Sequence, residues 1–281
     1  MLFGIVVNLQ KVNSAIALKS VIEQLKKHKV SYLIDSAAGA HFGYEDNLVS
    51  NEELYKASDI IIAIGGDGTI IHTAKQAALY NKPIIGINSG RVGYIASLEL
   101  SELDLLENVI SGDYTIENRM MLEAYVSSEP EKKYYCLNDV VINKATSSKI
   151  LDMTVLNSDD KIISFRSDGA VIATPTGSTA YAMSAGGPVT DPAVDCVILV
   201  PICAMSMYSR GFVLPSDSDI NLEISYSDGV SAVVKFDGNN SLILKPDETV
   251  NVKRANKLCA KLIRIKNESF YHTLKNKMKD F

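Results

Sequence analysis

The chain has 281 residues, of which 47% are hydrophobic, and a formal net charge of -5 at pH 7. This length allows two domains with sizeable cores, and the acidic balance excludes a general attraction to nucleic acid or to an anionic membrane surface. The four cysteines lack CxxC spacing and the four histidines lack paired ligand spacing, so we expect no zinc site and no disulfide framework. A reducing cytoplasm fits this pattern best. The longest apolar run, residues 196–205, is too short to cross a bilayer.

The first 112 residues alternate between strand-like and helix-like segments, which predicts an α/β domain with a parallel, Rossmann-like sheet. Apolar runs predict strands at residues 2–7, 30–34, 60–64 and 83–88. Helical spacing of apolar residues predicts helices at 15–27, 70–79 and 102–110, with a short helix at 52–57. The Gly- and Asn-rich residues 37–51 predict a surface loop.

The pattern changes after residue 113, where helical spacing nearly vanishes. Turn signals at 157–160, 227–229 and 237–240 separate strand-like runs, which predicts a mostly antiparallel β domain over residues 113–265. Within it, residues 177–186 (GSTAYAMSAG) favour a helix start or a tightly packed turn. Residues 266–281 are expected to form a last helix, which returns to the first domain or reaches a neighbouring subunit.

The most informative stretch is IIIAIGGDGTIIHT at residues 60–73, where a buried strand runs into a glycine-rich turn and then a helix. Its glycines let a bulky anion approach the backbone N–H groups, and the helix adds its positive end at the same place. Asp67 stands among these glycines, although a carboxylate repels phosphate unless it holds a divalent cation or takes a proton from the attacking group. The turn therefore indicates phosphate chemistry. The alternative is that Asp67 only caps the helix.

A second glycine-punctuated loop, NSGRVGY at residues 88–94, follows the next strand. In open parallel sheets ligands bind beyond the carboxyl ends of the strands, so we expect the two loops to line one crevice. Arg91 would then face a phosphate, the alternative being a solvated loop arginine.

Three stretches of the β-rich half carry groups suited to a nucleotide. Asn138 and Asp139 precede an apolar strand, where an amide can pair with a base or carboxamide and a carboxylate with ribose hydroxyls, the alternative being an Asx turn. In RSDGAVIATPTGSTAY, residues 166–181, small and hydroxyl residues open the backbone to a ligand, and Tyr181 offers a flat face for stacking unless it packs in the core. Asp237 lies in an Asp-Gly turn that closes a hairpin. The alternative is that Asp237 serves only to form this turn.

These motifs resemble, in the same order, those of the NAD kinases. The GGDGT turn also resembles that of diacylglycerol kinases, sphingosine kinases and 6-phosphofructokinases. The TPTGSTAY motif at residues 174–181 points to the NAD kinases among these families. The resemblance covers residues 2–265. It implies transfer of the terminal phosphate of ATP, or in some members of polyphosphate, to the 2′-hydroxyl of the adenosine ribose of NAD, which gives NADP. The alternatives are a lipid or sugar kinase with the same turn and a non-catalytic sensor of NAD or NADP.

The resemblance also implies roles for single residues. Asp67 matches the catalytic aspartate, which would accept the proton of the attacking hydroxyl. Arg166 matches a position where arginine accompanies a preference for NAD over NADH. The NAD-binding set is Gly68, Asn138, Asp139, Arg166, Asp168, Thr179, Ala180, Tyr181, Ser184 and Asp237, and the phosphate-donor set is Gly65, Gly66, Thr69 and, on its charge, Arg91.

Two positions depart from the family pattern. Asp139 stands where most members carry glutamate, and Met205 stands where members often have the histidine of a Pro-His-Ser stretch. We expect Mg²⁺ or another divalent cation to arrive with ATP, because the sequence contains no side-chain cage for it. Since family members are usually homodimers or homotetramers, we expect the same of this chain.

Overall fold

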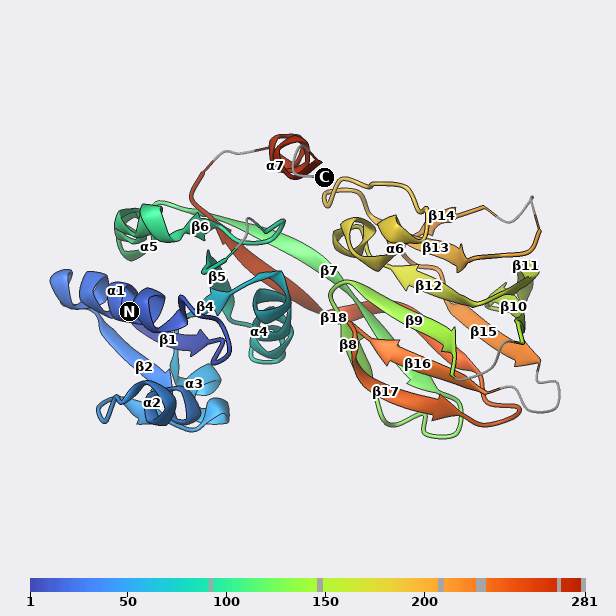
Figure 1. The fold of residues 1–281 in the computed structure, drawn as a ribbon, viewed down its shortest axis with the longest axis horizontal. Helices are drawn as coiled ribbons and strands as arrows, with labels where there is room; N and C mark the ends of the chain where they lie inside the picture. Colours follow the sequence, from blue (N-terminus) through green and yellow to red (C-terminus); the bar gives the residue numbers. More distant parts are fainter. Residues whose placement is uncertain (91–92, 146–148, 207–209, 226–230, 267–268, 279–281) are drawn as a thin grey trace. The chain divides into compact units, whose positions relative to one another are not determined.

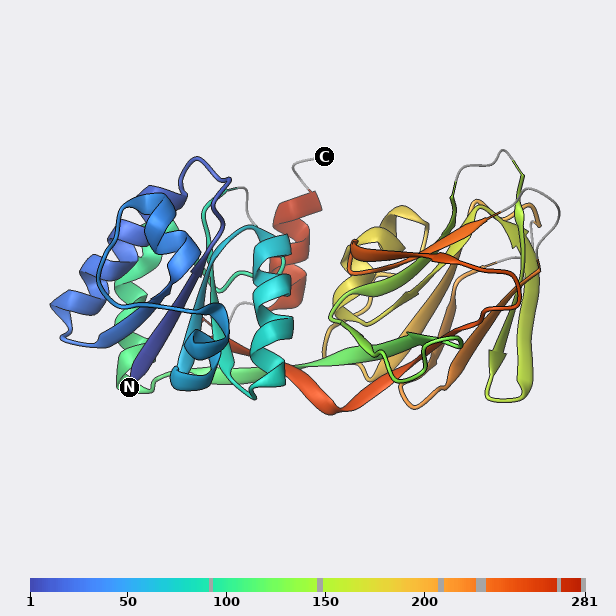
Figure 2. The same cartoon turned by 90° about the horizontal axis from the view of Figure 1, so that it is seen from below.

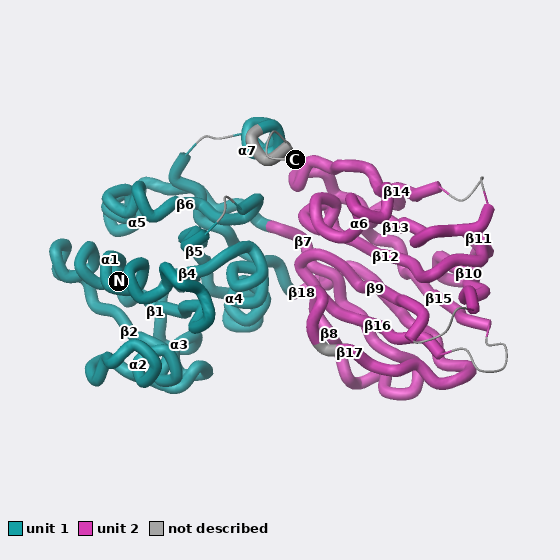
Figure 3. Tube along the Cα trace, in the orientation of Figure 1, with its two compact units in different colours: residues 1–118, 258–281 teal, residues 119–257 magenta. Residues whose placement is uncertain are grey.

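The computed structural model describes residues 1–90, 93–145, 149–206, 210–225, 231–266 and 269–278 (Figure 1). The chain forms two compact units (Figure 3). Unit 1 comprises Met1–Asn118 with Leu258–Phe281, and unit 2 comprises Arg119–Lys257. The chain passes from one unit to the other within β7 (Thr115–Val126) and returns within β18 (Val250–Arg264).

Unit 1 is built on a parallel sheet in which β18, β5, β4, β1, β2 and β3 lie side by side in that order, with β6 beside β5. All six residues of β4 are buried, as the unbroken apolar run predicts. The strands are β1 (Leu2–Val7), β2 (Ser31–Asp35), β3 (Leu48–Val49), β4 (Ile60–Gly65), β5 (Pro83–Asn88) and β6 (Leu98–Glu99). The predicted parallel α/β fold of the N-terminal part is confirmed.

Helices cover both faces of this sheet (Figure 2). The apolar faces of α1 and α5 join the sheet in one buried cluster that includes Leu18, Leu106, Ile5 and Ile62, while α4 packs on β4 and β5 and α3 on β1. The helices are α1 (Ser14–Lys27), α2 (Ser36–Phe42), α3 (Asn51–Ala57), α4 (Asp67–Leu79), the 3-10 helix η1 (Leu100–Leu105), α5 (Leu106–Ser111) and α7 (Phe270–Met278). Among the described residues, no helix is both long and apolar enough to cross a membrane.

The prediction of a surface loop over residues 37–51 is wrong, because α2 and β3 lie there. Asp35 Oδ1 accepts hydrogen bonds from the backbone N–H groups of Ala37 (3.1 Å) and Ala38 (3.3 Å), which caps the start of α2. Gly43 ends the helix in the left-handed conformation, with φ of 75°. The helix SAAGAHF buries only Ala38 and Gly39, so it has no stripe of large apolar residues that the sequence could reveal.

Unit 2 is an antiparallel β sandwich, which confirms the predicted fold class of the C-terminal part. One sheet has the order β14, β13, β12, β9, β16, β17. The other has β11, β10 and β15, with β18 beside β15 at residues 250–252. The strands are β8 (Tyr134–Cys136), β9 (Asp139–Lys144), β10 (Leu151–Asn157), β11 (Asp160–Ser167), β12 (Gly169–Ala173), β13 (Cys196–Ile202), β14 (Phe212–Pro215), β15 (Ile220–Ser225), β16 (Ala232–Phe236) and β17 (Asn239–Leu244).

Two predicted turns of unit 2 close hairpins, β10–β11 at residues 157–160 and β16–β17 at residues 236–239. The third, at residues 227–229, lies outside the described residues.

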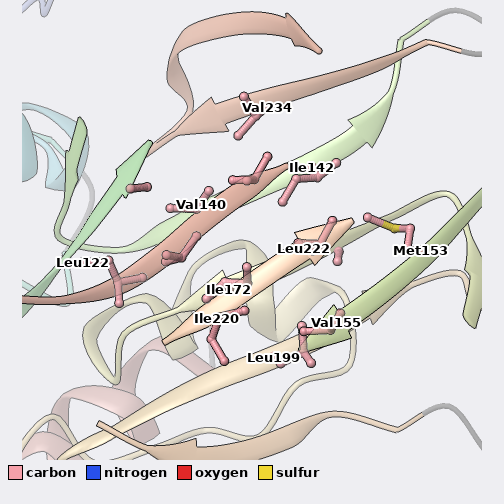
Figure 4. Close-up of a cluster of buried hydrophobic side chains, with 14 of the residues drawn as sticks. Leu122, Val140, Ile142, Met153, Val155, Ile172, Leu199, Ile220, Leu222 and Val234 are labelled. Carbon is pink, nitrogen blue, oxygen red and sulfur yellow. The ribbon is translucent and has the colours of Figure 1, made fainter. Parts of the chain in front are cut away.

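The core of unit 2 lies between its two sheets and contains alternate residues of each strand (Figure 4). Val140 and Ile142 of β9 belong to it, whereas Val141 belongs to a second cluster on the outer face of the six-stranded sheet. Ala182 of α6 (Tyr181–Ser184) is part of that outer cluster. The 3-10 helix η2 (Thr176–Thr179) leads into α6, so of the two alternatives predicted for residues 177–186 the structure shows the helix start.

Candidate active site

Asp67 lies where β4 ends and α4 begins, and it is held by a second loop. Gly66 occupies the N-cap position, so Asp67 is the first residue of the helix. Its Oδ2 accepts a hydrogen bond from the backbone N–H of Tyr94 (2.8 Å), and its Oδ1 accepts one from that of Ile95 (3.3 Å). Both donors belong to the segment after β5, so the carboxylate is oriented by the loop that follows the neighbouring strand.

Gly93 leaves the space that this carboxylate occupies. A Cβ atom on Gly93 would lie 1.9 Å from Asp67 Oδ1, far inside van der Waals contact. Gly93 belongs to the second glycine-punctuated loop of the sequence, but the sequence alone gives it no role. The signal that could have identified it is its place two residues after Arg91, a residue that lies outside the described ranges.

Two glycines of the turn line open space. An added Cβ on Gly66 or Gly68 would meet no atom within 4 Å, so an anion can approach the backbone at the start of α4. Thr69 is tied to the end of β1, because its Oγ1 accepts a hydrogen bond from Asn8 Nδ2 at 2.8 Å. Gly65 is buried directly beneath the Thr69 side chain.

A polar network supports the loop after β5. Asn88, only 1% exposed, donates from Nδ2 to the Glu99 carboxylate (2.9 and 3.1 Å) and accepts from the backbone N–H of Gly90 (3.1 Å). Burial raises the pKa of Glu99, the negative charges of Glu102 and Asp67 raise it further, and the Asn88 hydrogen bond and Lys266 oppose them.

Arg264 holds the same loop from β18. Its Nη1 donates to the backbone carbonyls of Ile95 (3.0 Å) and Ala96 (3.3 Å), and its Nε lies 2.7 Å from Glu117 Oε2. Ile95 therefore accepts a bond from Arg264 through its carbonyl and donates one to Asp67 through its N–H. Sequence reasoning missed Arg264, because the contact spans 169 residues of chain.

In unit 2, Asn138 and Asp139 lie at the start of β9 beside the β16–β17 turn. Asp139 is 4% exposed and Asn138 is half-buried. The Asp237 carboxylate accepts hydrogen bonds from the backbone N–H groups of Leu137, Asn138 and Asp139, at 2.8–2.9 Å. Asp237 adopts a positive φ of 49° in the hairpin turn. The turn therefore has a function beyond closing the hairpin, since its side chain anchors the Asn-Asp pair.

Two charged residues of the predicted NAD-binding set form ion pairs within unit 2. Asp168 Oδ1 lies 2.6 Å from Lys144 Nζ, and Arg166 Nε lies 2.9 Å from Asp152 Oδ1. The Arg166 side chain is 62% exposed, so its pair with Asp152 is a surface contact of small energy.

The remaining predicted residues lie on η2 and α6. Tyr181 is 42% exposed, so part of its ring is accessible to a ligand. Thr179 Oγ1 donates to the carbonyl of Thr176 (3.3 Å), Ala180 links η2 to α6, and Ser184 is exposed. Arg119, which is 6% exposed, donates from Nη1 to Thr176 Oγ1 at 3.0 Å and was missed from sequence.

Comparison with known proteins identifies the family. Models of the ATP-NAD kinase N-terminal and C-terminal domains match residues 3–114 and 137–265. The NAD kinase of Caldanaerobacter subterraneus subsp. tengcongensis is 34% identical over 278 residues, which cover 98% of each chain. The chain belongs to the NAD kinase family. The NAD kinase of Moorella thermoacetica is 35% identical over 280 residues, 99% of this chain and 89% of that one.

Solved structures of NAD kinases share the fold. The NAD kinase from Archaeoglobus fulgidus, solved in complex with ATP, aligns over 100% of both chains with a TM-score of 0.76 and 25% identity. Yeast NADH kinase aligns over 99% of this chain and 87% of that one, with a TM-score of 0.89 and 20% identity. The resemblance drawn from the GGDGT and TPTGSTAY motifs is thereby confirmed.

The NAD kinase motifs of the chain fall into two groups. Unit 1 brings the residues of the GGDGT turn together around the start of α4. Unit 2 brings Asn138, Asp139 and Asp237 into direct contact, and a hydrogen bond from the Thr174 N–H to the Asn138 carbonyl (2.8 Å) joins them to the TPTGSTAY motif. Within the ranges that the structure describes, no three His, Cys, Asp or Glu residues gather into a metal site.

Proposed function

We propose that this chain is an NAD kinase that transfers the terminal phosphate of ATP to the 2′-hydroxyl of the adenosine ribose of NAD, giving NADP. One observation carries the proposal: in a chain of the NAD kinase family, the Asp67 carboxylate is held by two backbone amides beside two glycines that line open space.

Asp67 accepts the proton of the ribose hydroxyl as this group attacks. A ribose hydroxyl is a poor nucleophile at neutral pH, and a positioned carboxylate that takes its proton lowers the barrier. The bonds from Tyr94 and Ile95 fix the carboxylate, which removes the entropic cost of orienting it during the reaction. Gly66 and Gly68 leave room for the phosphates of ATP against the positive end of the 13-residue helix α4.

Unit 2 binds NAD in this proposal. Asn138 pairs with a base or carboxamide and Asp139 with ribose hydroxyls, because an amide offers a donor and an acceptor and a carboxylate accepts from hydroxyls. The exposed part of the Tyr181 ring stacks on a base. In this proposal Thr179, Ala180 and Ser184 also contact NAD, and Arg166 and Asp168 offer it charged groups.

In this proposal a divalent cation accompanies ATP, and Mg²⁺ is the cation that we expect. Phosphoryl transfer depends on positioning and on neutralisation of charge, and the cation supplies part of that neutralisation when bound. The residues present fit a cation that arrives on the triphosphate, since Asp67 offers a carboxylate beside the open space at Gly66 and Gly68.

The test is an assay of NADP formation from NAD, ATP and Mg²⁺ by the purified protein, repeated with polyphosphate in place of ATP. We expect NADP with ATP, and we expect Asp67→Asn to lower kcat about 100-fold or more while NAD binding persists. Unchanged turnover in Asp67→Asn would remove this carboxylate from the chemistry. Binding of NAD without any NADP formation would favour the non-catalytic sensor.

We further infer a homodimer or homotetramer in the cytoplasm, from the family pattern of assembly and the cysteine spacing of the sequence. Light scattering after size-exclusion chromatography tests the assembly, and a mass equal to the 30.6 kDa of a single chain would overturn it.

A further inference from the structure

The segment Leu137–Asp139 has an unusual arrangement of backbone hydrogen bonds, because all three N–H groups converge on one carboxylate. Asp237 Oδ2 accepts from Leu137 N at 2.9 Å, and Asp237 Oδ1 accepts from Asn138 N at 2.8 Å and from Asp139 N at 2.9 Å. Hydrogen bonds to an ionised acceptor are roughly twice as strong as neutral ones. The N–H side of the segment is therefore firmly fixed.

The carbonyl groups of the same three residues are satisfied by Asp237 and by one further residue, Thr174. Thr174 Oγ1 donates to the Leu137 carbonyl at 2.6 Å, and Thr174 N donates to the Asn138 carbonyl at 2.8 Å. Asp237 N donates to the Asp139 carbonyl at 2.9 Å. Two residues thus provide a partner for all six backbone polar groups of the segment.

Thr174 is itself locked in place. It is 0% exposed, and its Oγ1 accepts a hydrogen bond from the Gly177 N–H at 3.0 Å. A Cβ on Gly177 would lie 2.2 Å from the Asn138 carbonyl oxygen, so the chain of the TPTG motif passes in direct contact with the segment. Because Thr174 is fully buried, it cannot touch a nucleotide and can act only through its neighbours.

We propose that Thr174 and Asp237 are positioning residues for NAD binding, which set the side chains of Asn138 and Asp139 by fixing the backbone of Leu137–Asp139. The inference rests on the proposed function, in which Asn138 and Asp139 hold NAD. A binding side chain whose backbone can shift by an ångström loses much of its interaction, so bracing of the backbone translates into affinity for NAD. Affinity for ATP does not depend on it.

The test compares Thr174→Val with Thr174→Ser. Valine keeps the shape and removes the hydroxyl, which leaves the Leu137 carbonyl and the Gly177 N–H without this partner, whereas serine keeps both bonds. We expect Thr174→Val to raise the KM for NAD about tenfold, with the KM for ATP unchanged, and Thr174→Ser to restore the NAD KM to within about twofold of the original. Thr154→Val, which removes a hydroxyl bonded to Ser164 elsewhere in unit 2, is the matched control.

An NAD KM that is unchanged in folded Thr174→Val, or raised equally in Thr174→Ser, would overturn the proposal. If Thr174→Val does not fold, Asp237→Asn serves instead: it keeps one acceptor oxygen, and an unchanged NAD KM in this variant would equally overturn the proposal. The variant Asn138→Ala distinguishes failure of the proposed NAD site from failure of the positioning role. If it leaves the NAD KM unchanged, the proposed NAD site fails, whereas a raised KM in Asn138→Ala together with an unaffected Thr174→Val defeats only the positioning role.

Discussion

Gly93 determines whether the Asp67 carboxylate can stay where it is. We predict that Gly93→Ala lowers kcat about 100-fold, because the new methyl group would overlap the Asp67 Oδ1 position and an ångström of displacement costs that much in rate. NAD binding should persist, since the NAD-binding residues proposed above lie in unit 2, apart from Gly68. Steady-state kinetics and calorimetric titration with NAD measure the two effects separately.

Gly90 offers the matched control within the same loop. A Cβ on Gly90 would meet no atom within 4 Å, so Gly90→Ala should leave kcat within about twofold of the original. Equal losses in the two variants would show that the loop, and not the space beside Asp67, is sensitive to substitution.

Glu99 makes the stability of unit 1 depend on pH. Because burial raises its pKa above the ordinary 4.5, the unfolded chain releases this proton at a lower pH than the folded chain does. The unfolded state is then favoured as pH rises, so the stability present below pH 4.5 declines as pH passes through the raised pKa.

We predict that Glu99→Gln, which cannot ionise, matches the original protein in stability near pH 4 and exceeds it at pH 7. Thermal unfolding at the two pH values measures this difference, with Glu107→Gln, an exposed glutamate of α5, as the control. A stability difference of the same size and sign at both pH values would mean that the ionisation of Glu99 has no part in it.

The residues of the candidate site differ in how visible they are in the sequence. Asp67 stands out because three glycines surround it between an apolar strand and a helix. Gly93 and Arg264 act on Asp67 through contacts that depend on the folded chain, the latter across 169 residues. Thr174 belongs to a motif that the sequence revealed, but its bonds to the segment at 137–139 follow from the pairing of β9 with β12. Local sequence pattern identifies the groups proposed to carry the chemistry, and tertiary pairing determines the residues that hold them in place.

Helices and strands are predictable from the sequence where burial leaves a regular pattern of apolar residues. The central strands β4 and β5 of unit 1 are largely apolar runs, because both faces of a parallel sheet are covered. The hairpin turns of unit 2 carry glycine or short polar residues with positive φ, namely Ser158 in one turn and Asp237 and Gly238 in the other. Helix α2 has no such pattern, because the residues on its buried face, Ala38 and Gly39, are small. Its two ends depend on capping by Asp35 and Gly43.

We predict that α2 depends on the Asp35 cap. Asp35→Ala removes the acceptor for two N–H groups and should destabilise the helix by about 1 kcal/mol, whereas Asp35→Asn, another good cap, should lose much less. Hydrogen exchange of residues 36–42 measures the effect as opening of this helix. Protection that is equal in the alanine and asparagine variants would show that packing of Ala38 alone maintains α2.

For the whole molecule, the path of the chain determines which part can fold alone. Unit 2 is continuous from residue 119 to residue 257, and every member of its main buried cluster lies within residues 120–252. Unit 1 is discontinuous, because β18 returns to pair Lys261 with Pro83 and Leu262 with Ile84, and Ile263 joins its core. Residues 1–118 alone therefore lack a strand of their sheet.

We predict that a fragment of residues 119–257 unfolds cooperatively on heating, whereas a fragment of residues 1–118 does not. The first fragment contains the whole proposed NAD-binding set except Gly68, so NAD should raise its melting temperature, with about 2.7 kcal/mol of stabilisation at 100 times the Kd. ATP with Mg²⁺ should raise it much less, since the GGDGT turn is absent. Calorimetry of the two fragments measures these effects. A fragment 119–257 that folds but gains nothing from NAD would place essential NAD contacts in unit 1, and one that never folds would show that the core of unit 2 is not sufficient on its own.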